Sequence, residues 1–245
     1  MKKYELTSNF KMYSDKKIFQ IRALVNLENG VKVGELGGWI EKEGNLSHNG
    51  NAWVSDNAWV TGNACVTDNA HVAGDAWVTG DAQVRDNACV TGNAQVRDNA
   101  WVTGDAQVRD SVQVRDNAHV AGNAWVRDNA WVTDNAHVAG DAHVSDNAWV
   151  SGNAWVTDKA WVTGKAHVAG NAWVSKIADL LQITGLGTAH RTTTVYRTKN
   201  GIEITCGCFC GNLEQFREQV VKTREGKVRD EYLKFAELIE IYFRL

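Results

Sequence analysis

Three cysteines at alternate positions are the densest group of potential metal ligands in the chain: Cys206, Cys208 and Cys210. Thiolates bind zinc, and a thiolate beside a histidine such as His190 can act as a nucleophile. Alternate residues of an extended strand point to one face, so the spacing predicts three thiols on one side of a strand. A fourth metal ligand is missing, and buried, inert thiols are the alternative explanation.

A polar segment just before these cysteines has the chemistry of an anion site. An imidazole, two guanidinium groups and three hydroxyls can together bind a phosphate or a nucleotide. The residues are His190, Arg191, Thr192, Thr193, Thr194 and Arg197. An exposed, threonine-rich strand with ordinary surface charges explains the same segment, and both interpretations stay open.

Tryptophan is the third group, with 11 in the chain, and most recur at multiples of six residues. Pairs that lie 18 residues apart predict apolar strips on the surface: Trp59, Trp77, Trp131, Trp149, Trp155 and Trp173. Such strips indicate self-association or a platform for stacking sugars or bases, although passive duplication of the repeat is an alternative. His119 and His137 share this spacing and are weak metal candidates.

The elements that position these side chains follow from a six-residue repeat. Ala recurs at every sixth position from 52 to 172, except at Val112, and Val recurs from 54 to 174. Ala and Val lie two apart and share the inner face of a short strand, with the residue between them outside. Gly or Asp followed by Asn or Asp suits a tight corner. The 21 hexads therefore predict about seven triangular coils of 18 residues.

This pattern resembles the hexapeptide repeat of left-handed parallel β-helices. The resemblance implies a trimer packed side by side, since such helices often assemble in that way. Gamma-type carbonic anhydrases of this fold bind zinc with interfacial histidines, and acyltransferases of this fold use a histidine and a projecting loop. The repeat here contains no inserted loop. The phrase LGGWIEKEGNLSHNGNAWV and the GNA-x-V hexads resemble proteins of prophages and other mobile elements, and this likeness carries over no catalytic residue.

The two ends differ in composition from the repeat. Residues 1–50 have three strand-like runs and predict a β-rich cap, with Leu46 in the Ala register. Residues 51–175 form the solenoid. Residues 176–245 predict an α+β module, with a hairpin at Asn200-Gly201, a helix capped by Asn212 and Gln215, and a second helix from about Asp230. That second helix is expected to place Tyr232, Phe235, Ala236, Ile239 and Tyr242 on one apolar side. The expected fold is thus mainly β.

Charge and composition narrow the expected partners. The formal net charge is −3, and the repeat has 14 Asp against 5 Arg and 2 Lys, so a nucleic-acid partner is not expected. No apolar run suggests a membrane span or a secretion signal, and five cysteines without a framework suit the bacterial cytoplasm. We expect no cofactor and a non-enzymatic phage-type scaffold, whose solenoid oligomerises while its C-terminal module binds a host protein, as in counter-defence. The alternatives are a nucleotide-binding protein or enzyme using the hairpin, and a trimeric acyltransferase-like enzyme.

Overall fold

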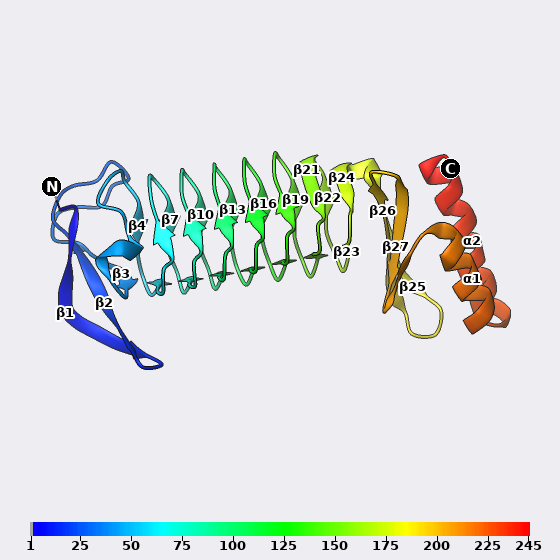
Figure 1. Cartoon of the computed structure of the whole chain (residues 1–245), viewed down its shortest axis with the longest axis horizontal. Coiled ribbons are helices and arrows are strands. Elements are labelled where there is room, and N and C mark those ends of the chain that lie inside the picture. The colour runs from blue at the N-terminus through cyan, green and yellow to red at the C-terminus, as the bar shows by residue number, and fades with distance from the viewer. Residues whose placement is uncertain (1) are drawn as a thin grey trace.

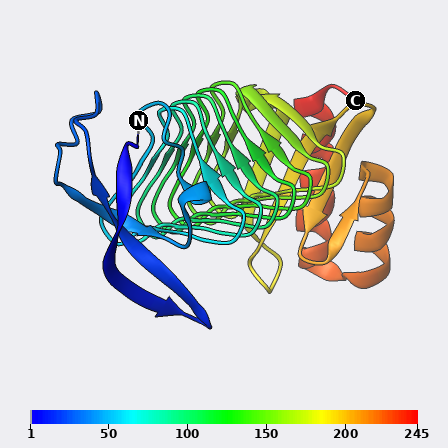
Figure 2. The same cartoon turned by 60° about the vertical axis from the view of Figure 1, so that its left-hand side comes forward.

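The molecule is an elongated rod with a different cap at each end (Figure 1). The computed structural model describes residues 2–245. An antiparallel hairpin lies at the N-terminal end, a stack of coils forms the middle, and a small sheet covered by two helices closes the C-terminal end. Figure 2 shows the coils stacked with their corners aligned along the rod.

Three parallel sheets form the sides of the solenoid. The first contains β5 (Trp59–Val60), β8 (Trp77–Val78), β11 (Gln95–Val96), β14 (Gln113–Val114), β17 (Trp131–Val132), β20 (Trp149–Val150) and β23 (His167–Val168). The second contains β6 (Cys65–Val66), β9 (Gln83–Val84), β12 (Trp101–Val102), β15 (His119–Val120), β18 (His137–Val138), β21 (Trp155–Lys159) and β24 (Trp173–Lys176). The third contains β4 (Trp53–Val54), β7 (His71–Val72), β10 (Cys89–Val90), β13 (Gln107–Val108), β16 (Trp125–Val126), β19 (His143–Val144) and β22 (Trp161–Val162).

The core and the corners confirm the roles expected for the repeated residues. The repeat Ala and Val residues are buried, and neighbouring strands pair with residues 18 positions further on, as in Val120 with Val138. At each corner a Gly or Asp adopts a left-handed conformation, with φ near 61° at Asp134. The Asp134 carboxylate accepts a hydrogen bond from the Gly152 backbone N–H of the next coil at 2.9 Å. Asp therefore both tolerates the turn and links adjacent coils.

The solenoid begins earlier than the perfect repeat does. β3 (Leu36–Ile40) pairs in parallel with β5, placing Ile40 beside Val60, and Leu46 bridges to Val66. These partners are 20 residues apart, so two extra residues lie between Leu46 and Val54. Leu46 consequently occupies a Val position, and the expectation that it lies in the Ala register was wrong. The early strand adds most of an eighth coil to the seven expected.

The N-terminal cap covers the first coil. β1 (Tyr4–Tyr13) and β2 (Lys16–Ala23) form an antiparallel hairpin, and β2 pairs with β3. Trp53, expected on the outer surface, is instead buried at 1% exposure under this cap. A side chain at Gly37 would collide with Ile21, with the Val54 carbonyl and with the Trp53 ring, so the glycine permits the close packing.

The C-terminal module closes the other end with an antiparallel sheet. Its strands are β25 (Leu180–Leu186), β26 (Arg191–Thr198), β27 (Gly201–Cys206) and β28 (Phe209–Gly211). Tyr196 of β26 is fully buried and belongs to the solenoid core. The expected hairpin is confirmed, with Lys199 and Asn200 as its turn.

Short 3₁₀ turns, each preceded by Lys and followed by Leu, lie near both ends of the solenoid: Glu43–Asn45 and Ile177–Asp179. In each turn the third residue, Asn45 or Asp179, accepts a hydrogen bond from the backbone N–H of the preceding lysine. Each turn leads directly into a leucine, and Leu180 packs against the solenoid core. The same local device therefore marks both borders of the regular coils.

Two helices cover the outer face of the C-terminal sheet. In α1 (Leu213–Thr223) the Asn212 side chain accepts from the Gln215 N–H at 2.9 Å, which confirms the predicted capping box. α2 (Gly226–Phe243) begins before Asp230 because Val228 already packs against the module core. Phe243 is buried and Tyr242 is 40% exposed, so the assignment of Tyr242 to the apolar side was wrong. The buried residue that follows Ile239 on this face of the helix is therefore Phe243, four positions on, and not Tyr242, three positions on.

The fold class predicted from the sequence is confirmed. The chain is mainly β, a parallel β-helix of 18-residue coils between an N-terminal β cap and a C-terminal α+β module. Among residues 2–245, no helix has the length and apolar character needed to cross a membrane.

Candidate functional site

A continuous row of aromatic rings runs along the second sheet of the solenoid. We call it the ring ladder, and it consists of Trp101, His119, His137, Trp155 and Trp173. Successive ring centroids are 5.4, 4.8, 4.4 and 5.4 Å apart, and neighbouring planes differ by at most 28°. The 18-residue repeat produces this order because it places one outward side chain above the next.

A cation lies at each end of the ring ladder. The Arg85 guanidinium lies 4.4 Å from the Trp101 ring centroid, and Lys199 Nζ lies 5.0 Å from that of Trp173. Cations are attracted to indole faces, so both groups stabilise the ends of the stack. Lys199 comes from the C-terminal hairpin, and the ladder therefore ends against the other module.

The two histidines inside the ladder favour the neutral form. Partial burial between neighbouring rings lowers the pKa of His119, and the nearby Arg85 charge lowers it further. Burial also lowers the pKa of His137, and repulsion from His119 adds to the effect. A stack of neutral rings avoids two adjacent positive charges.

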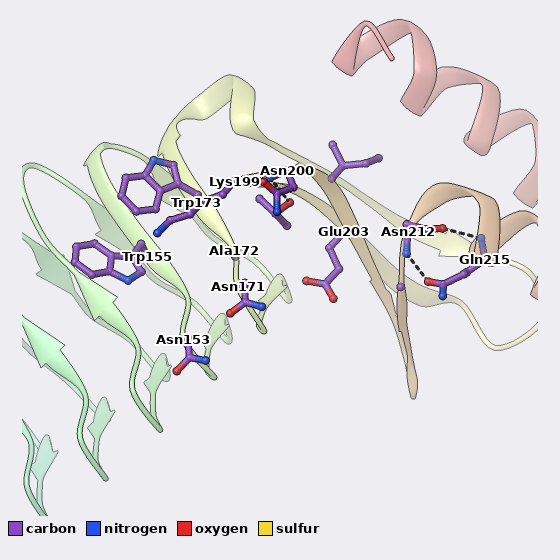
Figure 3. Close-up of a pocket in the computed structure, with 13 residues that line it drawn as sticks. Asn153, Trp155, Asn171, Ala172, Trp173, Lys199, Asn200, Glu203, Asn212 and Gln215 are labelled. Atoms are coloured by element: carbon purple, nitrogen blue, oxygen red, sulfur yellow. Dashed lines mark hydrogen bonds between the residues drawn. The ribbon is translucent and has the colours of Figure 1, made fainter.

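A groove of about 490 Å³ opens where the ring ladder meets the C-terminal module (Figure 3). Its volume falls in the range of about 300–1,000 Å³ common for small-molecule sites. We call it the junction groove. It is lined by Asn153, Trp155, Asn171, Ala172, Trp173, Thr198, Lys199, Asn200, Ile202, Glu203, Gly211, Asn212 and Gln215. Three elements of the chain thus contribute: the last coils, the hairpin and the start of α1.

Carboxamides dominate the polar lining of the junction groove. Asn153 Oδ1 accepts from Asn135 at 3.1 Å, at the end of a row of asparagines that follows the ring ladder. Asn212 and Gln215 use their side-chain oxygens to cap α1. These three side chains keep their NH₂ groups as donors. Asn171 and Asn200 make no side-chain hydrogen bond within residues 2–245, so they offer both a donor and an acceptor.

Glu203 supplies the only carboxylate that lines the groove within the described chain. Cys210 Sγ donates to Glu203 Oε1 at 3.1 Å. Burial and the neighbouring Glu203 charge raise the pKa of the Cys210 thiol to about 11. A protonated thiol is a weak nucleophile, so the cysteine that bonds Glu203 from outside the groove lining is a hydrogen-bonded thiol and not a reactive thiolate.

The three predicted tryptophan pairs differ in how their rings contact each other and the neighbouring side chains. Trp59 and Trp77 stack at 4.9 Å, and Tyr13 of the N-terminal hairpin packs edge-on against both. Trp131 and Trp149 lie 6.1 Å apart in an edge-to-face contact, with Arg115 over Trp131. Trp155 and Trp173 belong to the ring ladder, and the 18-residue pairing of all three pairs is present.

The six residues of the predicted anion site do not converge. Thr193 and Thr194 are fully buried, where Thr193 donates to Cys206 and Thr194 accepts from the His167 N–H. Arg197 donates to the Phe243 carbonyl at 2.9 Å, while Thr192 bonds Thr184. His190 and Arg191 are exposed at the far end of β26. Among these threonines, Thr194 joins the sheet to the last coil, whereas Thr192 and Thr193 bond partners within the sheet.

The expectation that the three cysteines share one face of a strand was wrong. Gly207, with φ near 62°, turns the chain between β27 and β28, so Cys206 pairs with Phe209 and Cys210 pairs with Thr205. Cys206 is buried, whereas Cys208 and Cys210 are exposed. His119 and His137 stack face to face and do not point at a common centre. Residues 2–245 contain no group of three or more potential metal ligands.

Comparison with known proteins gives no functional assignment. No protein family matches the chain, and no curated protein matches it. The function must therefore be inferred from the geometry of the ring ladder and the junction groove.

Sequence reasoning found the two groove tryptophans but missed Lys199, Asn200 and Glu203 as their partners. The sequence indicates these three residues only indirectly, because it predicts the hairpin turn but not the face of the solenoid that the turn contacts. The asparagines that precede many of the repeat Ala residues were assigned only to corners, although their 18-residue spacing also predicts a row of amides.

Proposed function

We propose that this protein is a non-enzymatic binding protein in which the solenoid is a rigid rod and the junction groove holds the ligand. The observation that carries the proposal is the composition of the groove. Trp155 and Trp173 come from the rod, whereas Lys199, Asn200 and Glu203 come from the C-terminal hairpin. Apolar rings beside a few polar groups are typical of ligand sites.

The two enzymatic alternatives have weaker support. Acyltransferases with a similar fold use a loop that projects from the coils. The coils from Trp53 to Val174 contain no such inserted loop. A hairpin enzyme would need a catalytic cysteine beside His190. Instead, Cys206 contacts Thr193 at 3.1 Å, and the His190 ring contacts the Gly185 carbonyl at 3.4 Å.

The biological setting belongs to the same proposal. The resemblance of the segment before the repeat to prophage proteins favours a phage-type protein in the bacterial cytoplasm, acting on a host target, as in counter-defence. The exposed Trp faces favour a homo-oligomer, with a trimer as the first choice. The rod would then set the spacing between several copies of the groove.

Affinity purification from a bacterial host tests the proposal. Wild type, the Trp155→Ala/Trp173→Ala variant and Trp161→Ala as a control are compared, since Trp161 is 51% exposed and lies on another sheet. We expect a protein or small molecule that copurifies with wild type and the control and is lost from the groove variant. A companion retained equally by all three proteins contradicts the assignment of the groove.

A further inference from the structure

The polar groups of the junction groove suit a ligand rich in hydroxyls. A hydroxyl both donates and accepts hydrogen bonds, and a carboxamide offers the same pair of functions. Free NH₂ donors come from Asn153, Asn212 and Gln215, and Asn171 and Asn200 present complete amides. Glu203 adds an acceptor. In Figure 3 its carboxylate points toward Asn171 across the groove.

The apolar wall suits the C–H groups of a sugar ring. Trp155 and Trp173 are 39% and 36% exposed, and their planes differ by 16°. The two rings stack on each other, and His137 and Lys199 lie over their outer faces, so the exposed ring edges form a nearly continuous apolar strip over two coils. Aromatic side chains bury large apolar areas while keeping a defined orientation, and a pyranose ring offers matching apolar C–H groups.

Charge argues against an anionic ligand. Among residues 2–245, Lys199 is the only cation that lines the groove, together with the Glu203 carboxylate. Phosphate groups are usually held by several cations or by bidentate arginines. Arg197, the nearest arginine in the hairpin sequence, donates to the Phe243 carbonyl instead. The acidic solenoid also repels an approaching anion.

We propose that the junction groove binds a neutral saccharide, with its apolar C–H groups against the exposed edges of Trp155 and Trp173 and its hydroxyls on the surrounding amides. This inference rests on the proposed function, because it names the ligand class of the same groove. Binding should depend on the indoles and amides and not on the charge of Lys199.

Isothermal titration calorimetry with three neutral trisaccharides tests the inference in the full-length protein: maltotriose, cellotriose and triacetylchitotriose. ATP and a short single-stranded oligonucleotide serve as anionic probes. We expect saturable binding of at least one trisaccharide that is insensitive to salt and to Lys199→Gln. Trp173→Ala should weaken this binding about tenfold, because the indole supplies most of the apolar contact. Trp161→Ala should leave it unchanged.

The possible outcomes separate the two proposals. If none of the trisaccharides binds, or if their binding is insensitive to Trp173→Ala and Asn171→Ala, the saccharide assignment is overturned. Binding of ATP that is lost in Lys199→Gln would overturn the ligand class while leaving the groove as the binding site. The proposed function itself fails only if the copurified companion is also indifferent to the groove variants. Circular dichroism confirms that each variant keeps its fold.

Discussion

At the scale of single residues, the outward position of each hexad has different effects in different places. This position holds Trp53, which is buried under the N-terminal cap. It also holds the stacked pair Trp59 and Trp77 beside Tyr13, and the rings of the ring ladder. Local sequence cannot distinguish these settings because the hexads are nearly identical. What surrounds each residue decides its role.

The ring ladder should make stability depend on pH. Since burial lowers the pKa of His119 and His137 in the folded state, the unfolded chain binds more protons near its ordinary pKa of about 6.5. Their contribution is therefore present above pH 6.5 and is lost as pH falls through the lowered folded pKa. In thermal unfolding of the wild type, we expect the midpoint temperature to decrease as the pH is lowered from 7.5 to 5.

The matched variant for that prediction is His119→Gln/His137→Gln, because Gln occupies the same position in Gln83 and Gln113. We expect a shallower pH dependence than in wild type, with the remaining slope coming from the other histidines. An identical slope in the double variant would show that the ladder histidines titrate as they do in the unfolded chain.

At the scale of elements, the corners and the caps explain why the repeat can stack without long strands. Most strands of the solenoid span two residues, so corner hydrogen bonds contribute much of the order between coils. The Asp carboxylates reach the backbone of the next coil, and rows of Asn side chains bond one another. These polar rows lie outside a core built from Ala and Val.

Substitutions at Asp134 measure the corner contribution. Asp134→Ala removes the carboxylate bond to the Gly152 N–H and places a Cβ-bearing apolar residue at positive φ. We expect a loss of about 1–3 kcal/mol in the free energy of unfolding. Asp134→Gly should cost less, since Gly occupies equivalent corners. Urea unfolding followed by circular dichroism measures both, and equal losses would assign the whole effect to the hydrogen bond.

The C-terminal sheet should stabilise the rod by covering its last coil. Tyr196 is fully buried against the solenoid core, and Tyr196→Ala should cost about 3–5 kcal/mol in the free energy of unfolding. It should also promote end-to-end association, because uncovered strand edges pair readily. Tyr242→Ala, at an exposed position, is the control. Urea unfolding and sedimentation velocity make the comparison, and a wild-type result for Tyr196→Ala would contradict the capping role.

The sequence predicted the coils better than it predicted their ends. Strict spacing of Ala and Val fixes the register wherever no residue is inserted. The two extra residues after Leu46 break that count and moved Leu46 to a different position than expected. The junction groove was not predictable, because its residues come from modules whose docking depends on Tyr196, Thr194 and Thr205 meeting the last coil.

At the scale of the whole molecule, the exposed tryptophans on different sheets separate ligand binding from assembly. Trp131 and Trp149 lie on the first sheet, away from the ring ladder. If this face drives oligomerisation, Trp131→Gln/Trp149→Gln should reduce the mass measured by light scattering to that of one chain. Trp125 and Trp161, which are exposed on the third sheet, provide the matched control pair. A mass unchanged by the first double variant would exclude this face as the interface.

Because the coils repeat every 18 residues, the number of residues in the solenoid sets both its length and the orientation of one end relative to the other. Deleting one full coil, such as residues 83–100, should shorten the molecule by about 4.8 Å and leave every remaining face aligned. Deleting a single hexad should instead rotate the C-terminal module by one side relative to the N-terminal hairpin. Insertions and deletions in multiples of 18 thus change only reach, whereas other multiples of six redirect the groove around the axis.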